Sequence, residues 1–188
     1  PKVDGIKVLE EIKNNSGYKI PKNMIVTTAF SNNRVMQKCS EYNVDYYMIK
    51  PYDNNHLLQI INEIRTAKDL IKLKPKIVRI YPVLVIKGTA LEEEYNKGEY
   101  EPLTVNQAVE RCKELCYMFA KKKINVIRIG LQNTETICSP TNEGSEVVAG
   151  PYHETFRQLV ESSMYYDTIE EKIKNFNTRV KEVEIIVN

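Results

Sequence analysis

The sequence predicts an α/β protein built from β-α units with parallel strands. Short apolar segments typical of buried strands alternate with longer segments whose apolar residues recur at helical spacing. The chain has 188 residues, of which 42% are hydrophobic and 28% charged, a composition that suits one ordinary domain or two small ones. We therefore expect two sets of β-α units, which meet where the composition changes at "KLKPK".

The part of the chain before this change is predicted to begin with a helix. Ile6, Leu9 and Ile12 follow Asp4 and Gly5 at the spacing of one helical face. The further elements that we expect are a strand over 23–30, a helix from Ser31 to about Glu41, a strand over 44–50 and a helix from Asp53 to about residue 72.

The part after it is expected to start with an extended apolar segment, "IVRIYPVLVIKG", which Pro82 interrupts. Thr104 and Gln107 have the spacing of a capping box, which predicts a helix from there to about Lys123. The elements that follow are a buried strand over 125–132, a polar loop over 133–146, helices near 151–163 and 167–181, and a last strand in "VEIIVN". The sequence thus divides into residues 1–72, a seam at 73–76 and residues 77–188.

The segment "VDYYMIKPYD" places a lysine at the end of an apolar strand. In open α/β sheets the carboxyl ends of parallel strands are where ligands bind, so Lys50 is well placed for an anion. Thr28 ends the preceding strand and adds a hydroxyl at the same edge. Together they would hold two oxygens of one phosphoryl group. The alternative is an exposed lysine at a strand end beside a buried threonine.

The blocks "PKVDGIKVLEEI", "IVTTAF", "VDYYMIKPYD" and "LLQIINEI" resemble the second half of a response-regulator receiver domain of the sporulation master-regulator type. The resemblance covers residues 1–72 and implies half of a flavodoxin-like fold. It implies that Thr28 and Lys50 bind the phosphoryl group and that Tyr47 is the switch aromatic. It also implies Mg²⁺ and a histidine kinase or phosphotransferase as a partner in phosphorelay signalling.

One departure from the receiver pattern limits this hypothesis. In such domains the aspartate that accepts phosphate, and the acidic pair that holds Mg²⁺, lie upstream of the position of Pro1, and Asp4 falls in the wrong loop to replace them. The chain begins with Pro1 rather than Met, so we expect the reading frame to start inside a longer protein. The segment by itself is predicted not to take up phosphate.

Two arginines stand inside apolar strands of the second part, Arg79 in "IVRIYP" and Arg128 in "VIRIGLQ". A buried arginine is costly unless it meets a carboxylate or phosphate. Strict alternation would put Arg128 and Gln132 on one face together with Gly130. If that face lines a barrel, these side chains are candidates for ligand contacts in the lumen. The alternative is that each arginine snorkels to solvent or pairs with a structural carboxylate such as Glu135.

The blocks "IYPVLVIKGT" and "AGPYHETFRQLVES" resemble the C-terminal part of bacterial radical SAM proteins related to the Elongator catalytic subunit. The resemblance covers about residues 76–187. It implies the last strands of a partial TIM barrel, and it implies that the parent enzyme uses a [4Fe–4S] cluster with S-adenosylmethionine. The related Elongator-type proteins act on transfer RNA, so RNA is the substrate that analogy suggests.

The cluster motif of that family, C-x₃-C-x₂-C, has no counterpart in this chain. Cys112 and Cys116 are separated by three residues, but they fall on the apolar face of the helix expected after Thr104, which predicts core thiols. Cys138 stands by itself in the polar loop. His153, in "GPYHE", is a candidate for a substrate or a structural contact. No metal site is expected from these residues.

Charge and cysteine usage exclude some classes of protein. The net charge of +2 does not by itself indicate a nucleic-acid partner, and the run 121–123 suits the basic end of a helix. No apolar run approaches the roughly 18 residues of a membrane span, and no signal peptide opens the chain. The four cysteines lack a paired secretory spacing, which favours a cytoplasmic location.

The sequence therefore predicts a fusion or fragment chain, with a receiver segment followed by a radical SAM segment and neither activity complete. The alternatives are a radical SAM portion that acts in RNA modification and an inert α/β scaffold. In a complete receiver domain the apolar strand over 23–30 is interior and pairs with another strand on each side. Here it would need a new partner on one of these sides. We expect a strand at 77–86 or 125–131 to pair with it in a hybrid sheet. The competing outcome is two separate half-sheets.

Overall fold

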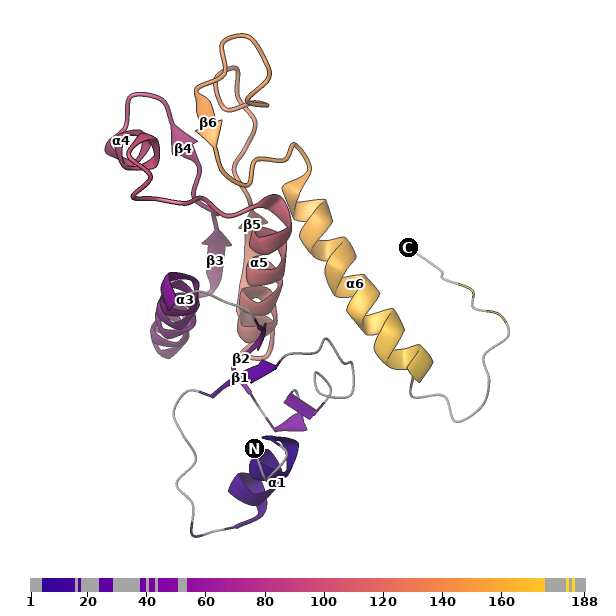
Figure 1. Cartoon of the computed structure of the whole chain (residues 1–188). Helices are drawn as coiled ribbons and strands as arrows, with labels where there is room; N and C mark the ends of the chain where they lie inside the picture. The colour runs from indigo at the N-terminus through magenta and orange to yellow at the C-terminus, as the bar shows by residue number, and fades with distance from the viewer. Residues whose placement is uncertain are drawn as a thin grey trace. The chain divides into compact units, whose positions relative to one another are not determined.

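The computed structural model describes residues 5–15, 17, 24–28, 38–39, 41–42, 44–50, 54–174, 182 and 184, which form an α/β fold, as predicted (Figure 1). Its contacts divide the chain into two units, Pro1–Lys68 and Asp69–Asn188, which are described separately below. The division falls inside helix α3 (Asn54–Lys72), and Lys74 just beyond that helix has a positive φ of 51°.

The first unit contains helix α1 (Gly5–Asn14) and the parallel strands β1 (Ile25–Thr28) and β2 (Tyr46–Ile49), followed by most of α3. The register runs from Ile25 beside Tyr46 to Thr28 beside Ile49. Asp45 ties this pair to α3, because it accepts the Met24 N–H at 2.7 Å and forms a 2.6 Å ion pair with Lys68. The best-buried apolar residues of the unit are Leu9, Cys39, Met48, Ile60, Ile64 and Ala67.

The second unit is built on a parallel pair, β3 (Ile77–Ile80) and β5 (Asn125–Ile129), with helix α5 (Val105–Ala120) between them in the chain. A smaller antiparallel pair joins β4 (Val85–Ile86) to β6 (Val147–Ala149), and the short helix α4 (Ala90–Asn96) follows β4. Helix α6 (Phe156–Lys174) completes the described part of this unit.

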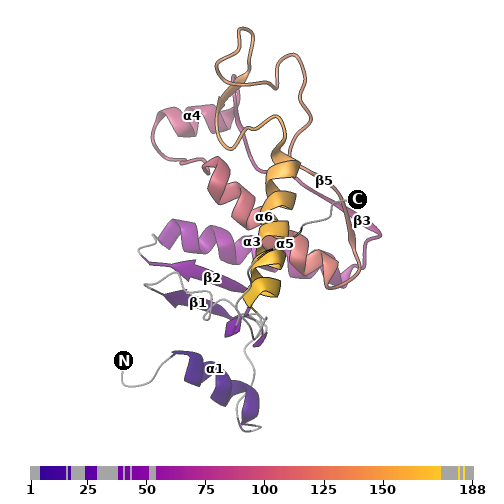
Figure 2. The ribbon, with the colours of Figure 1, turned by 90° about the vertical axis from the view of Figure 1, so that its right-hand side faces the viewer.

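The core of the second unit lies between α5, α6 and one face of the β3–β5 pair. It consists of Ala108, Val109, Cys112, Cys116, Ile129, Phe156 and Val160, with Ile80 and Val126 packed against it. Figures 1 and 2 show α5 in front of β5 in the first view and to its left in the second, so it covers one side of the strands. No helix within the described residues 73–174 covers the opposite side.

The predicted capping box begins α5. The Thr104 hydroxyl accepts the Gln107 N–H at 3.3 Å, and the Gln107 side chain accepts the Thr104 N–H at 2.9 Å. These two bonds satisfy donors that the first turn of a helix leaves without a partner. The local sequence thus sets where the main helix of the core begins.

A buried lysine joins α5 to α6. The Lys113 side chain is 5% exposed and forms ion pairs with Glu110 at 2.7 Å and Asp167 at 2.9 Å. Burial alone would lower the Lys113 pKa, but hydrogen bonds and attraction from both carboxylates outweigh it, and the pKa is raised above 10.5. Ser163 adds a 3.2 Å hydrogen bond to Glu110.

The structure corrects two expectations. Among the described strands, β1 and β2 pair only with each other, so the hybrid sheet is not formed and separate two-stranded sheets are observed. The two helices expected near 151–163 and 167–181 are one helix as far as Lys174, because Val160 and Met164 pack on the core through the expected break. Most of the helix expected from Ser31, and of the last strand in "VEIIVN", lies outside the described residues.

Candidate functional site

The candidate site is the carboxyl edge and the uncovered face of the β3–β5 pair. Parallel strands joined through a helix present their carboxyl ends together, and ligands of α/β folds bind at that edge. Here β3 ends at Ile80 and β5 at Ile129, and the Gly130 N–H donates to the Ile80 carbonyl at 2.9 Å. Tyr81 continues from the first strand, and residues 130–132 continue from the second.

A β-bulge places the two arginines side by side. Val78 lies beside Val126, whereas Arg79 lies beside Arg128, so Ile127 is an extra residue in β5. Without it, alternation from Val126 would turn Arg128 toward the core. With it, Ile129 enters the core instead, and Arg128 takes the face of Arg79.

This arrangement corrects the expectation of buried arginines. Arg79 is exposed, and Arg128 is half-buried with its Nη1 donating to Gln132 Oε1 at 3.0 Å. Gln132 is itself exposed. The pairing with Glu135 is not observed among the described contacts. Arg128 and Gln132 lie together, as alternation along the strand predicts, and Ile129 lies on the opposite face in the core.

His153 lies at the same edge, where the chain enters α6. Its Nδ1 accepts the Thr155 N–H at 3.1 Å, so the side chain helps to start the helix, and the neutral ring carries its proton on Nε2. His153 also lines a small cavity between the strand ends, together with Gly130 and Pro151. The cavity volume of about 10 Å³ suits one water molecule and is too small for a nucleobase. A ligand at this edge would therefore bind on the surface.

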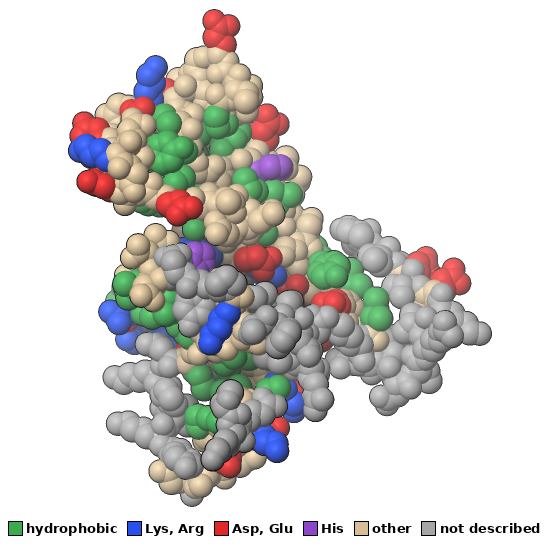
Figure 3. Space-filling model, in the orientation of Figure 1, with side chains coloured by type: hydrophobic (Ala, Val, Ile, Leu, Met, Phe, Trp, Pro, Cys, Tyr) green, Lys and Arg blue, Asp and Glu red, His purple; other side chains and the backbone are tan. Residues whose placement is uncertain are grey.

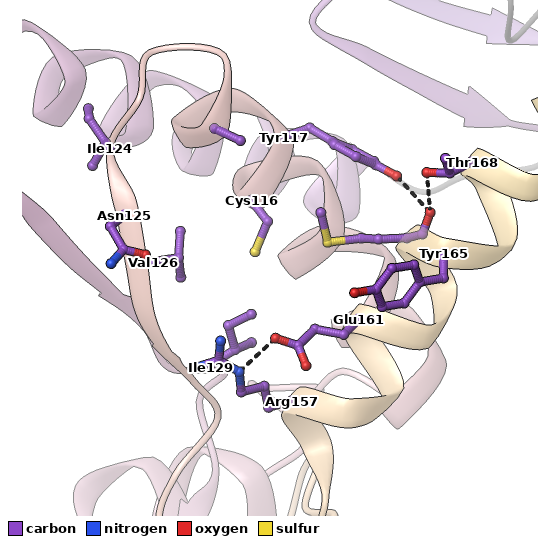
Figure 4. Close-up of a pocket in the computed structure, with 12 residues that line it drawn as sticks. Cys116, Tyr117, Ile124, Asn125, Val126, Ile129, Arg157, Glu161, Tyr165 and Thr168 are labelled. Atoms are coloured by element: carbon purple, nitrogen blue, oxygen red, sulfur yellow. Dashed lines mark hydrogen bonds and ion pairs between the residues drawn. The ribbon is translucent and has the colours of Figure 1, made fainter. Parts of the chain in front are cut away.

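A groove with a volume of about 390 Å³ lies among α5, β5 and α6 (Figure 4). Figure 4 shows Arg157 bonded to Glu161, at 2.7 Å, and the hydroxyls of Tyr117 and Thr168 directed at one backbone oxygen, that of Met164. Burial raises the pKa of the Tyr117 hydroxyl to about 12. This groove therefore offers packing and internal hydrogen bonds rather than a reactive group.

The cysteines do not fit an iron–sulfur cluster. Cys112 and Cys116 are buried in the core as predicted, and burial raises the pKa of the Cys116 thiol to about 11. Cys138 lies in the loop after β5, where its thiol is 3.4 Å from the Glu135 carbonyl oxygen. Within the part of the chain that the structure describes, no group of three or more metal-binding side chains exists. The described residues therefore supply no ligand set for a [4Fe–4S] cluster.

In the first unit the structure brings Thr28 and Lys50 together. The Lys50 N–H donates to the Thr28 carbonyl at 2.6 Å, so both residues lie at the carboxyl end of the β1–β2 pair. Lys50 is exposed and Thr28 half-buried, while Tyr47 lies within β2, beside Val26. The phosphoryl-binding and switch roles of these three residues remain predictions.

Charge on the face of the protein in Figure 3 is mixed. At the upper left, around α4, acidic and basic side chains lie near one another instead of gathering into one patch. No helix in the described part of the chain is long and apolar enough to cross a membrane. The overall charge of this face therefore indicates no ligand, whereas a specific pair of cations such as Arg79 and Arg128 indicates an anion.

Comparison with known proteins supports the second of the two resemblances. Residues 75–166, just under half of the chain, match the family model of the Radical_SAM C-terminal domain. A tRNA uridine(34) acetyltransferase of Methanocaldococcus jannaschii is 51% identical over 37 residues, which are 20% of this chain and 7% of that protein. An uncharacterized protein of the same organism is 54% identical over 44 residues, 23% of this chain and 14% of that protein.

The family match supports a radical SAM C-terminal segment over residues 75–166, which belong to the second unit. The chain spans only a small part of the length of either relative. The family match begins at residue 75, so it gives no support to the receiver resemblance of residues 1–72.

Sequence reasoning missed two features of this site, the bulge at Ile127 and the exposed ring of Tyr81, which follows β3 directly. A signal for the second was present, because Ile77, Arg79 and Tyr81 alternate with Val78 and Ile80. All three alternating residues are exposed in the structure.

Proposed function

We propose that this chain is a portion of a radical SAM enzyme that modifies RNA, and that the second unit binds the substrate at the carboxyl edge of β3 and β5. The observation that carries the proposal is the match of residues 75–166 to the Radical_SAM C-terminal domain. The relative named for its action on tRNA uridine supports RNA as the substrate class. The geometry adds an exposed edge with cationic, amide and imidazole groups, namely Arg79, Arg128, Gln132 and His153.

The part that these residues take in the proposed enzyme is to bind and orient the RNA. The family implies a [4Fe–4S] cluster and S-adenosylmethionine, but the described residues offer no ligand set for the cluster. Guanidinium groups bind phosphate oxygens in pairs, amides read base edges, and the neutral His153 ring presents an N–H donor. Each of these contacts positions a substrate without itself starting a reaction.

The test is inactivation of the gene in the source organism, followed by mass spectrometry of the nucleosides of its transfer RNA. We expect at least one modified nucleoside to be lost or to give way to a precursor, and the intact gene to restore it. An unchanged nucleoside profile, under conditions where the gene is expressed, would contradict the proposal.

A receiver-type role for residues 1–72 is a second proposal, favoured by the hydrogen bond that sets Lys50 beside Thr28 at a strand edge. Acetyl phosphate and Mg²⁺ would be added to the protein expressed from its complete reading frame, and phosphorylation followed by phosphate-affinity electrophoresis. The proposal expects a phosphorylated species, and Lys50→Gln should reduce it because a cation near the phosphoryl group is lost. A protein that stays unphosphorylated would contradict it.

A further inference from the structure

The feature that carries a further inference is the pairing of two arginines in register on neighbouring parallel strands. Arg79 of β3 and Arg128 of β5 are Cα partners, and neighbouring strands lie about 4.8 Å apart. A guanidinium is charged throughout the physiological pH range. Like charges directly opposite each other in a sheet repel and destabilise it.

No carboxylate offsets this repulsion within the described structure. None of its ion pairs involves Arg79 or Arg128, and the Arg128 side chain donates instead to the uncharged Gln132 side chain. The contrast with Lys113 is informative, because that cation on the helix side has two carboxylates within 3 Å. The arginine pair results from a single β-bulge. Bulges often change the direction of a side chain next to a binding site.

The surroundings of the pair indicate which anion would bind. Ile77 and Tyr81 share the face of Arg79 by alternation and are 53% and 45% exposed. We call Ile77, Arg79, Tyr81 and Arg128 the open face. Two adjacent guanidinium groups suit the oxygens of a phosphate, and an exposed tyrosine beside them suits the flat surface of an unstacked base. Cations interleaved with an aromatic ring are the usual combination for single-stranded RNA.

We propose that the open face binds single-stranded RNA, with one backbone phosphate held between Arg79 and Arg128 and the adjacent base stacked on Tyr81. This rests on the proposed function and specifies the form of its substrate. The phosphate neutralises the repulsion between the arginines, so the site gains more from this ligand than two isolated cations would. Because the open face lacks an enclosed cavity, the contact anchors the strand and leaves the base edges to other groups.

The test measures binding of the full chain to a fluorescein-labelled single-stranded RNA by anisotropy, over a series of salt concentrations. We expect Arg79→Gln and Arg128→Gln each to weaken binding about tenfold, as the loss of a charged hydrogen bond does. Removal of both arginines should also lower the slope of log K against log salt by about 0.7, the contribution of one phosphate. The double variant should lose less than the product of the two single losses, because both arginines hold the same phosphate.

Two variants make the measurement specific. Lys122→Gln removes the same charge from the exposed turn before β5, at the opposite end of the strands, and should change affinity less than about twofold. Tyr81→Leu keeps the charge and removes the ring, so it should weaken binding about tenfold without changing the salt slope. Circular dichroism melts should show that all these variants fold like the parent chain.

The outcomes separate this inference from the proposed function. If Arg79→Gln and Arg128→Gln bind RNA no differently from Lys122→Gln, the open face is not an RNA site, even if gene inactivation changes tRNA nucleosides. If the arginine variants lose RNA binding while the nucleoside profile of the inactivated strain is normal, the binding site stands and the proposed function fails.

Discussion

The two faces of the β3–β5 pair are made from the same strands and have opposite surroundings. On the covered face, Ile80, Val126 and Ile129 pack on α5 and α6, and Lys113, a buried cation of α5, is neutralised by two carboxylates. On the open face, Ile77 is exposed and Arg79 lies beside Arg128 without a carboxylate in the described structure.

The difference teaches which face holds the fold together and which is available for a ligand. Burial of apolar surface stabilises in proportion to its area, so the covered face contributes nearly all of the packing energy of this sheet. The open face combines exposed apolar groups with like charges, features that weaken an isolated protein and favour a bound partner. Three substitutions, each with a control variant, test this difference between the two faces. They are given in order of their expected effect on the free energy of unfolding.

Ile129→Ala is expected to have the largest effect. Ile129 is 6% exposed in the core cluster, and removal of its outer atoms leaves a cavity, which should lower the free energy of unfolding by about 3.5 kcal/mol. The matched change Ile77→Ala, on the open face, should lower it by less than about 0.5 kcal/mol. Urea denaturation of both variants measures the difference. Equal losses would show that the open face is buried in solution.

Gly130→Ala is expected to have the second-largest effect on the free energy of unfolding. Gly130 follows β5 directly and packs against Phe156, the first residue of α6. Gly130 has a φ of +81°, and an added Cβ would lie 3.0 Å from atoms of the Phe156 side chain. Left-handed backbone strain and overpacking together should lower the free energy of unfolding by about 3 kcal/mol.

Gly98→Ala is the control for the turn, since Gly98 has a φ of +75° with no atom within 4 Å of an added Cβ. Only the backbone strain then remains, and the expected loss is about 1 kcal/mol. Thermal melts of both variants separate the two contributions. Similar losses would mean that Phe156 moves aside, and the close packing of this turn would not be a constraint.

Lys113→Met is expected to have the smallest effect of the three, about 2 kcal/mol, because its partners are partly exposed and solvent screens them. The Lys113 pKa is raised in the folded protein, so its ion pairs contribute stability that is fully present below pH 10.5 and lost as the pH rises through the raised pKa. The difference between parent and variant should therefore be constant through neutral pH and shrink in strongly alkaline solution.

Arg79→Met serves as the control for Lys113→Met, since it removes a cation that has no carboxylate partner in the described structure. The substitution should change the free energy of unfolding by no more than about 0.5 kcal/mol. A small gain is expected, because the repulsion from Arg128 is removed. Urea denaturation at pH 7 and above pH 11 tests both variants. A large loss for Arg79→Met would show that the protein itself supplies an anion to the open face.

Much of the local structure could be predicted because its causes are local. The capping box predicted the start of α5 at Thr104, and the helical spacing of Cys112 and Cys116 predicted that both thiols are buried. The interruption of the segment after residue 76 at Pro82 was also correct, because proline cannot continue a strand ladder.

Other features depend on contacts between distant residues and could not be predicted. Alternation within β5 could not give Arg79 as the cross-strand partner of Arg128, since the bulge at Ile127 arises from the register with β3. The two-residue strand β4 is too short for a sequence pattern. It forms only because β6, about 60 residues later in the chain, pairs with it. The expected break in α6 is absent because packing on the core outweighs the weak local preference.

The sequence by itself determined strands β1, β2, β3 and β5, the start of helix α5 and the burial of its thiols, because periodicity and capping act over a few residues. Only the tertiary structure decided that Arg79 and Arg128 lie side by side on an uncovered face, because strand register depends on how residues some fifty positions apart pair. The resulting pair of neighbouring positive charges is what makes the open face a site for an anion.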